Sequence, residues 1–466
     1  MNSRASNTTL ASDRLSFWTK LIYGMGDWGN TTTSTIFGFF YAFFLNNVAG
    51  LEPLYTAPVL LIGMIWDAVN DPIIGVLSDK VHTRWGRRRP FFLIGALPLT
   101  ITFIALWWVP PISTQIGKML YFLVTYLLYD TAFTFVTVPY VALTPELSED
   151  YDERTRLTGF RMVVSMAGGL ISAVALPLGV SLFPNLRQGY MVIVTIFGIS
   201  ACIPYFVLFF KVKERYSAEP PSTLGIFSGF LYTWKNKAFR YVAGIYASAW
   251  ITISLAGSLF QYYVTYYLRA PEQVDLVLGA LMTSALIFIP VLVFMSNRLG
   301  KKKAFMIAVS VWVVVMLAIA FLPANGILFA YILVGIAGFG IAAAHVIPWS
   351  MTPDVIEQDE LANGVRREGT FYGFMVFLQK SGAALALGGM QLALHFAKYQ
   401  LPPDENNPLS VTQPQSALLA IRLLTGLVPA ILLTFSIFFA ARYPISKEKH
   451  NETREALRVK RVARAD

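Results

Sequence analysis

The stretch Ile65-Trp66-Asp67-Ala68-Val69-Asn70-Asp71-Pro72 places two carboxylates and an amide inside a segment that is otherwise apolar from Tyr55 to Leu77. Crossing a membrane takes about 20 apolar residues, and this segment is long enough. A carboxylate in hydrocarbon is costly without a partner, so an intramembrane pair indicates a functional site. Asp67 and Asp71 are four residues apart and share one helix face. Two such close negative charges require a cation or a proton, so the pattern favours a Na⁺ or H⁺ site. Pairing of both aspartates with a neighbouring arginine is the structural alternative.

The composition extends this reading to the whole chain. Of its 466 residues 55% are hydrophobic and only 14% are charged, whereas soluble domains carry about 25% charged residues. The expected fold is therefore an all-α polytopic membrane protein with twelve transmembrane helices. The predicted spans are 17–46, 55–78, 90–112, 118–145, 158–183, 190–211, 239–268, 273–296, 304–323, 326–351, 368–397 and 415–441.

The net charge of +10 is distributed as in a membrane protein rather than a nucleic-acid-binding one. With twelve spans, the loops on one face hold only four basic residues, and nearly all the others lie in the opposite loops and tails. The four are Lys118, Arg187, Arg269 and Lys398. This positive-inside pattern predicts a multi-pass protein of the cell inner membrane or plasma membrane with both termini in the cytoplasm. No nucleic-acid partner is expected, and the polar residues 1–16 predict no cleaved signal peptide.

The spans divide into two similar halves. We expect an N-terminal six-helix half (1–212), a cytoplasmic central loop (213–237), a C-terminal six-helix half (238–443) and a basic cytoplasmic tail (444–466). Val138-Pro139-Tyr140 leading to Thr144-Pro145-Glu146 recurs as Ile347-Pro348-Trp349 leading to Thr352-Pro353-Asp354. The basic turn after Asp79 likewise recurs at 297–303. Repeated halves with a site between them are typical of secondary transporters that work by alternating access.

The short loop after the second span carries an acid, a glycine and a run of bases. It resembles the loop signature of the major facilitator superfamily, in which such residues latch the two halves on the cytoplasmic side. The resemblance assigns the latch to Gly75, Asp79, Arg84, Arg87 and Arg88. A plain topology determinant is the alternative.

Several further motifs in the same order narrow the resemblance. They are Tyr23-Gly24-x-Gly26-Asp27-x-Gly29-Asn30, Trp66-Asp67-Ala68-x-Asn70-Asp71-Pro72, Arg84-Trp85-Gly86-Arg87, Val138-Pro139-Tyr140-x-Ala142-Leu143-Thr144-Pro145, Asp152-Glu153-Arg154-Thr155-Arg156 and Lys380. Over its whole length the chain resembles the glycoside–pentoside–hexuronide:cation symporters, the family of the melibiose permeases within the major facilitator superfamily. The resemblance implies symport of a sugar-type solute with Na⁺ or H⁺, without another cofactor.

By this resemblance the cation ligands are Asp67, Asn70, Asp71 and Thr134, with the two aspartates as the charged ligands of Na⁺. The chemistry agrees, because hard cations take oxygen ligands and two carboxylates supply the charge. The amide at Asn70 favours Na⁺ over H⁺ as the coupling ion, and the proton stays the alternative.

The candidate substrate site departs from the melibiose-permease pattern. Its residues are Asp27, Thr31, Thr137, Tyr140, Arg161, His345, Trp349 and Lys380. Thr31 and Thr137 stand where those permeases place sugar-binding aspartates, while Arg161 and Lys380 align with substrate-site positions. Anionic sugars such as hexuronides therefore become more plausible than a galactoside. A packing role for His345, neutralisation of Asp67 or Asp71 by Lys380, and a latch role for Arg161 stay open.

Other classes of function are disfavoured. The sequence has no metal-ligand motif, nucleophile elbow or phosphate loop, so no catalytic residues and no enzyme activity are expected. A non-transporting sensor is disfavoured because the sequence predicts no appended soluble domain that could relay a signal. A carrier of lysophospholipids or other amphiphiles on the same fold is the main alternative to a sugar symporter. The expected working unit is a monomer in the lipid bilayer.

Overall fold

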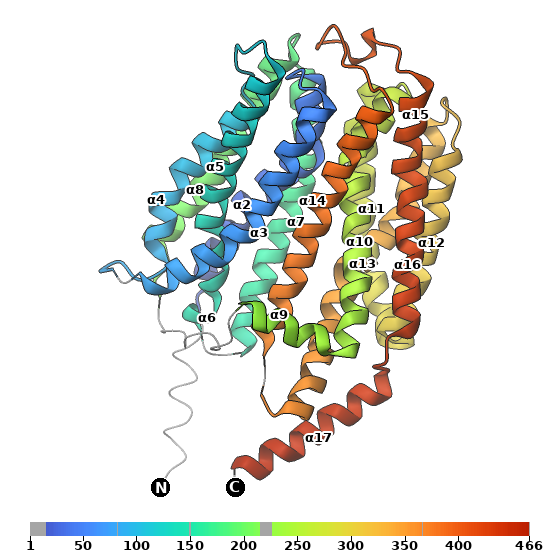
Figure 1. Ribbon diagram of the computed structural model, residues 1–466. Coiled ribbons are helices and arrows are strands. Elements are labelled where there is room, and N and C mark those ends of the chain that lie inside the picture. The colour runs from blue at the N-terminus through green and yellow to red at the C-terminus, as the bar shows by residue number, and fades with distance from the viewer. Residues whose placement is uncertain (1–14, 82, 149–150, 215–225, 366, 466) are drawn as a thin grey trace. The chain divides into compact units, whose positions relative to one another are not determined.

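The structure is a computed structural model that describes residues 15–465 apart from 82, 149–150, 215–225 and 366 (Figure 1). Among these residues all regular structure is helical, which confirms the all-α prediction. The helices are α2 (Phe17–Asn47), α3 (Pro53–Lys80), α4 (Arg89–Leu106), α5 (Gln115–Ala142), α6 (Thr144–Leu147), α7 (Tyr151–Ser181), α8 (Leu186–Lys211), α9 (Ile226–Lys235), α10 (Lys237–Tyr262), α11 (Val274–Leu299), α12 (Lys301–Phe321), α13 (Ile327–Asn363), α14 (Glu368–Phe396), α15 (Gln415–Arg422), α16 (Val428–Arg442) and α17 (Lys447–Ala465).

Each predicted span coincides with a long helix or, for 415–441, with the continuous helical run Gln415–Arg442. Ten helices of the described part are long and apolar enough to cross a membrane, and α2 and α14 coincide with the two remaining predicted spans. Side chains such as Ile101 (64% exposed), Val314 (66%) and Leu385 (69%) need lipid as their solvent. The chain is therefore a multi-pass membrane protein.

Three predicted boundaries were wrong by several residues. The span expected over 158–183 begins earlier, as α7 at Tyr151. The span expected over 90–112 ends as α4 at Leu106, because Pro110 and Pro111 cannot continue a helix. The span expected over 326–351 continues as α13 to Asn363, where Gly364 adopts a left-handed conformation with φ +73° and ends the helix.

The helices form two compact units. Unit 1 comprises Met1–Pro220 with Leu401–Asn407, and unit 2 comprises Pro221–Gln400 with Pro408–Asp466. In unit 1, α2 packs on α7 and α8, α3 on α5, and α4 on α5 and α8. In unit 2, α10 packs on α14 and α16, and α13 packs on α11 and α12.

Small residues permit close packing inside these units. At Gly340 an added Cβ would lie 2.3 Å from the side chain of Trp312, which is itself fully buried. Only glycine therefore lets α13 approach α12 this closely.

In unit 2 the C-terminal carbonyls of α12 are satisfied by side chains from a π-helical turn and from the residue that precedes a second one. These turns are η1 (Tyr263–Tyr267), after α10, and η4 (Leu423–Leu427), between α15 and α16. Tyr263 donates to the carbonyl of Ile319 at 2.7 Å, and Arg422 donates to that of Ala320 at 2.9 Å. A helix end in a membrane protein needs such donors because its last carbonyls have no partner within the helix.

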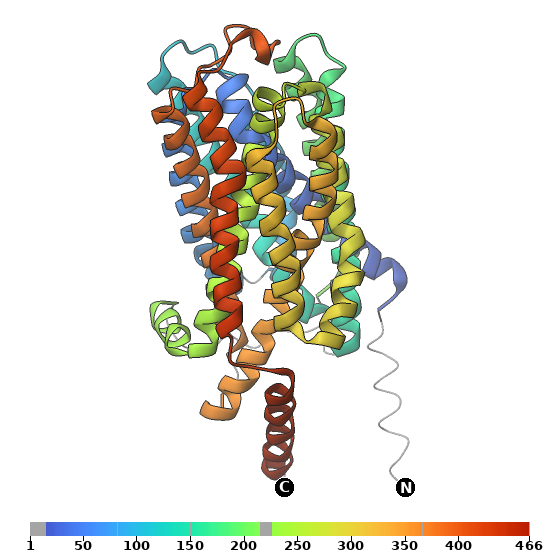
Figure 2. The ribbon, with the colours of Figure 1, turned by 90° about the vertical axis from the view of Figure 1, so that its right-hand side faces the viewer.

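Two helices lie in the segments predicted as the central loop and the basic tail. α9 falls within the predicted central loop, and α17 forms most of the predicted basic tail (Figure 2). On α17, Nδ1 of His450 lies 3.4 Å from Asp354 and 3.7 Å from Glu357, both on α13.

Candidate functional site

The predicted cation ligands lie at the interface of α3 and α5. Thr134 is fully buried on α5 and donates a 3.1 Å hydrogen bond to Oδ1 of Asp71 on α3. Asp67 lies one turn before Asp71 and is half-buried. Trp66 also joins the two helices, because its Nε1 donates to Thr131 at 2.9 Å. The hydroxyl and the carboxylates are thus oxygen ligands of the kind that Na⁺ takes.

Asn70 has a different partner from the other predicted ligands. Its Nδ2 lies 3.4 Å from both the carbonyl oxygen and Oδ2 of Asp130 on α5. Asp130 is buried, with 5% of its surface exposed. The α3–α5 interface therefore carries three acids, Asp67, Asp71 and Asp130. No group of three or more His, Cys, Asp or Glu side chains in the described residues is arranged to hold a metal ion, so a cation here would depend on hydroxyl or backbone oxygens as well.

An intramembrane ion pair joins α2 and α7. Nε of Arg161 donates to Oδ2 of Asp27 at 2.7 Å, and Nη2 donates to Oδ1 at 3.3 Å. Asn30 donates to the same carboxylate at 3.3 Å. Asp27 is 2% exposed. The cationic residue predicted to hold a substrate anion is therefore neutralised by its own bidentate partner in this arrangement.

Two tyrosines hold this ion pair in place. The guanidinium of Arg161 lies over the ring of Tyr140 at 4.9 Å, a cation–π geometry. Tyr140 donates to the carbonyl of Tyr23 at 2.7 Å, and the hydroxyl of Tyr23 pairs with Thr144. The glycine at position 26 is required here, because an added Cβ would lie 2.3 Å from the Tyr140 ring. Tyr140 is fully buried, so within unit 1 its ring packs against the guanidinium of Arg161.

The two threonines that replace the expected aspartates are already engaged. Thr31 shares a 2.7 Å hydrogen bond with Ser165 on α7. Thr137 donates to the carbonyl of Phe133 on its own helix at 2.9 Å. Neither threonine supplies a carboxylate of the kind that binds sugar hydroxyls in the melibiose permeases.

The candidate substrate residues of unit 2 include an aromatic cluster. Trp349 on α13 stacks on Tyr372 of α14 with centroids 5.5 Å apart and lies edge-on to Tyr246 of α10. Tyr246 bonds Gln379, the neighbour of Lys380. His345 is exposed, four residues before Trp349, and bonds the carbonyl of Ile341. Tyr246 and Tyr372 were missed from the sequence because nothing in a single apolar span tells a stacking tyrosine from a packing one.

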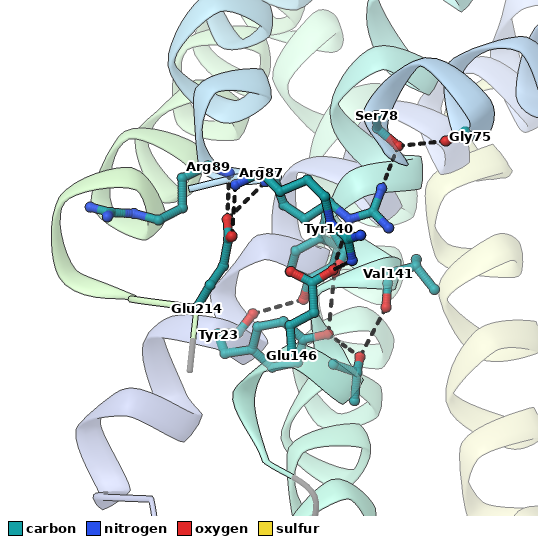
Figure 3. Close-up of polar contacts among 11 residues, drawn as sticks. Tyr23, Gly75, Ser78, Arg87, Arg89, Tyr140, Val141, Glu146 and Glu214 are labelled. Carbon is teal, nitrogen blue, oxygen red and sulfur yellow. Dashed lines mark hydrogen bonds and ion pairs between the residues drawn. The ribbon is translucent and has the colours of Figure 1, made fainter. Parts of the chain in front are cut away.

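The basic loop after α3 is bound within unit 1 (Figure 3). Arg87 pairs with Glu146 of α6, and Nε of Arg88 lies 3.1 Å from the same carboxylate. Arg88 also donates to Ser78, whose hydroxyl bonds the carbonyl of Gly75 at 2.9 Å. Arg84 is exposed and lies over the Trp85 ring at 4.7 Å. The side chain of Asp79, the predicted acid of the latch, lies outside the described residues.

Glu214, which follows α8, holds the same loop from the other side. Its carboxylate accepts hydrogen bonds from the backbone N–H groups of Arg87 (2.7 Å), Arg88 (2.8 Å) and Arg89 (3.1 Å), at the start of α4. A carboxylate at a helix N-terminus satisfies unpaired donors and the helix dipole together. At Gly86, where φ is +110°, an added Cβ would lie 2.5 Å from Glu214. The glycine of the Arg-Trp-Gly-Arg motif thus leaves the space that the Glu214 carboxylate occupies.

Unit 2 repeats the acid–base pair at the related position. Nζ of Lys301, in the second basic turn, lies 2.7 Å from both carboxylate oxygens of Asp354. Glu146 and Asp354 each follow a Thr-Pro pair. The internal repeat in the sequence therefore corresponds to the same local pairing in each unit.

The comparisons with known proteins agree with these features. The family model described as MFS/sugar transport protein matches residues 22–447. The chain belongs to this family of the major facilitator superfamily. The predicted resemblance to its cation symporters is thereby confirmed.

Three relatives illustrate the range of the family. An uncharacterized symporter of Synechocystis is 32% identical over 97% of this chain and 98% of its own. The sodium-dependent lysophosphatidylcholine symporter 1 of Gallus gallus is 30% identical over 96% and 90%. The inner membrane symporter YicJ of Escherichia coli is 28% identical over 95% and 94%. The chain is thus similar to symporters along its full length.

Solved structures with the same fold are more distant in sequence. A crystal structure of the nucleoside transporter NupG matches with a TM-score of 0.64 and 13% identity, covering 91% of this chain and 98% of that one. A bacterial homologue of the lysosomal transporter Spinster also gives 0.64 and 13%, over 98% and 99%. These similarities confirm the major facilitator fold.

Proposed function

We propose that this membrane protein is a cation-coupled symporter in which Na⁺ binds at the α3–α5 interface. The observation that carries the proposal is the pairing of Thr134 with Asp71, with Asp67 one turn away on the same helix. Two carboxylates and a buried hydroxyl from adjacent helices form a hard-cation site in a segment where an uncompensated charge would be costly. Relatives described as sodium-dependent support Na⁺ over H⁺.

The proposed solute is an amphiphile with a charged headgroup, of the lysophospholipid class. The Asp27–Arg161 pair offers one anion and one cation held 2.7 Å apart. A zwitterionic headgroup matches such a pair, because its phosphate can accept from the guanidinium while its cation meets the carboxylate. Relatives named as lysophosphatidylcholine symporters support this class.

A sugar-type solute is the second candidate. The stacked rings of Trp349 and Tyr372 present an aromatic surface on which a sugar ring can stack. The family description also names sugar transport. Thr31 and Thr137 weigh against a galactoside because they lack carboxylates. In either case the proposed orientation places both termini in the cytoplasm, and the proposed working unit is a single chain.

Uptake into proteoliposomes tests both candidates. Na⁺ and H⁺ gradients are imposed separately, with fluorescent lysophosphatidylcholine (followed by albumin back-extraction), a uronide and its neutral parent sugar as solutes. We expect albumin-protected lysophosphatidylcholine to accumulate under the Na⁺ gradient alone. Accumulation of a sugar instead would identify the second candidate, a sugar-type solute, as the substrate in place of a lysophospholipid. If the amount of every solute inside the vesicles were the same with and without the Na⁺ and H⁺ gradients, symport would be contradicted.

A further inference from the structure

α9 is a short helix that lies across the ends of α10 and α14 instead of along them (Figures 1 and 2). The ring of Phe230 packs 4.8 Å from Phe374 and 5.2 Å from Phe377, both on α14. Thr233 is fully buried. Asn236 follows α9 and caps α10 by accepting the N–H of Phe239 at 3.1 Å. α9 is therefore a packed element placed where a membrane-spanning helix begins.

A polar contact fixes α9 to the extension of α13. The hydroxyl of Tyr232 lies 3.1 and 2.9 Å from the two carboxylate oxygens of Asp359. The guanidinium of Arg367 lies 4.3 Å above the Tyr232 ring. Burial, and then the neighbouring Asp359 carboxylate, raise the pKa of Tyr232, which therefore stays a hydrogen-bond donor at neutral pH.

Another side of α9 leaves large apolar side chains exposed, although the ring of Trp234 also lies 5.8 Å from that of Phe374 on α14. Leu231 is 63% exposed and Trp234 is 51% exposed, and the two are three residues apart on one side of the helix. Phe377, beside Phe230, is 38% exposed. The adjoining basic side chains are all exposed. They are Lys235, Lys237 and Arg240.

We propose that this face of α9 docks on anionic lipid headgroups of the membrane surface at the N-terminal end of α10. Since α10 starts two residues after α9 ends, α9 lies at the depth of the headgroups. An in-plane helix with leucine and tryptophan on one side and bases beside them is the pattern of interfacial binding. The stretch 226–240 contains three bases and no acid, so its charge complements an anionic leaflet. Through Tyr232 and Asp359, the same contact ties the lipid surface to α13.

The test measures where α9 lies in a bilayer. A single cysteine, Leu231→Cys, is introduced in a Cys202→Ser background, labelled with an environment-sensitive fluorophore and reconstituted in phosphatidylcholine with or without phosphatidylglycerol. We expect blue-shifted emission that is quenched by brominated lipid, and stronger quenching with phosphatidylglycerol. The matched control is Ala362→Cys, which is exposed on the α13 extension and should give water-like, unquenched emission. Emission at position 231 equal to that of the control in both lipids would overturn the proposal.

A charge variant separates lipid binding from simple apolar burial. The triple variant Lys235→Gln, Lys237→Gln, Arg240→Gln should lose the enhancement by phosphatidylglycerol while retaining quenching in phosphatidylcholine. The control variant Arg298→Gln, Lys303→Gln removes two exposed bases of the α11–α12 turn and should retain the enhancement. An unchanged enhancement in the triple variant would refute the headgroup contact. A blue shift that depends on protein concentration and ignores brominated lipid would instead show a second copy of the chain as the occupant.

Discussion

The hydroxyl of Thr134 on α5 donates a 3.1 Å hydrogen bond to Oδ1 of Asp71 on α3. Both groups lie in membrane-spanning helices, where polar side chains are retained for a function or for a partner. The bond fixes one carboxylate oxygen of Asp71 and orients the hydroxyl oxygen toward it. Coupling of a cation to transport would thus depend on the register of α3 against α5.

The first prediction concerns Thr134. Thr134→Val keeps the shape of the side chain but removes the oxygen, so Na⁺ affinity should fall about fivefold, the equivalent of one hydrogen bond of about 1 kcal/mol. Sodium-dependent uptake measured over a range of Na⁺ concentrations checks this. Thr125→Val is the matched control, because Thr125 on the same helix bonds only backbone carbonyls of its own helix. Equal Na⁺ dependence in the two variants would remove Thr134 from the site.

The second prediction concerns the carboxylates themselves. Asp67→Asn and Asp71→Asn each remove one charge, so gradient-driven accumulation should be abolished while downhill exchange survives in part. The measurement compares concentrative uptake with counterflow in the same vesicles. Undiminished accumulation by both single variants would rule out this site.

The third prediction concerns the buried ion pair. Removal of one partner from such a pair leaves an uncompensated charge and costs about 3–5 kcal/mol. Asp27→Asn should therefore lower the thermal unfolding midpoint strongly, and Asp27→Asn with Arg161→Gln should recover much of the loss. Arg161→Lys keeps the charge but loses the planar fork, so affinity for a phosphate-bearing solute should fall about ten- to a hundredfold. Thermal unfolding in detergent measures the stability of the variants, and a binding assay measures the affinity for the solute. A double variant less stable than Asp27→Asn would contradict the pairing.

The fourth prediction concerns pH and the contact between the start of α2 and α7. The carboxylate of Glu153 lies 2.7 Å from Nζ of Lys20 and also accepts the N–H of Leu15. Burial alone would raise the pKa of Glu153, but the hydrogen bonds from Lys20 and Leu15 and the charge of Lys20 lower it below its ordinary value. Because the folded-state pKa is the lower one, the stabilisation is present above about pH 4.3 and is lost as the pH falls through the folded value.

Hydrogen exchange of residues 17–23 as a function of pH checks this prediction. Protection should fall as the pH drops below about 4.3, and Glu153→Gln should show the unprotected behaviour at all pH values. Equal protection of the wild-type protein and the Glu153→Gln variant at neutral pH would contradict the role of the Glu153–Lys20 pair.

The structure also shows which features a single sequence can reveal. The spans were predictable because lipid requires long apolar helices. Asp67 and Asp71 could be selected as a candidate site because charged residues are rare inside such helices. The pairing of Arg161 with Asp27 was not predictable, since 134 residues separate them and no local pattern encodes the contact. α9 was missed because its helical pattern covers only ten residues. Glu214 was missed because a carboxylate in a charged loop gives no sign that it will cap α4.

The most direct test of Na⁺-coupled symport is reciprocal binding to the purified protein. Lysophosphatidylcholine affinity is measured at several Na⁺ concentrations, and Na⁺ affinity at several lysophosphatidylcholine concentrations. Since coupling between two sites is mutual, each ligand should raise the affinity for the other by the same factor, and Asp71→Asn should remove the effect. Affinities for the two ligands that are independent of each other in the wild-type protein would contradict the account.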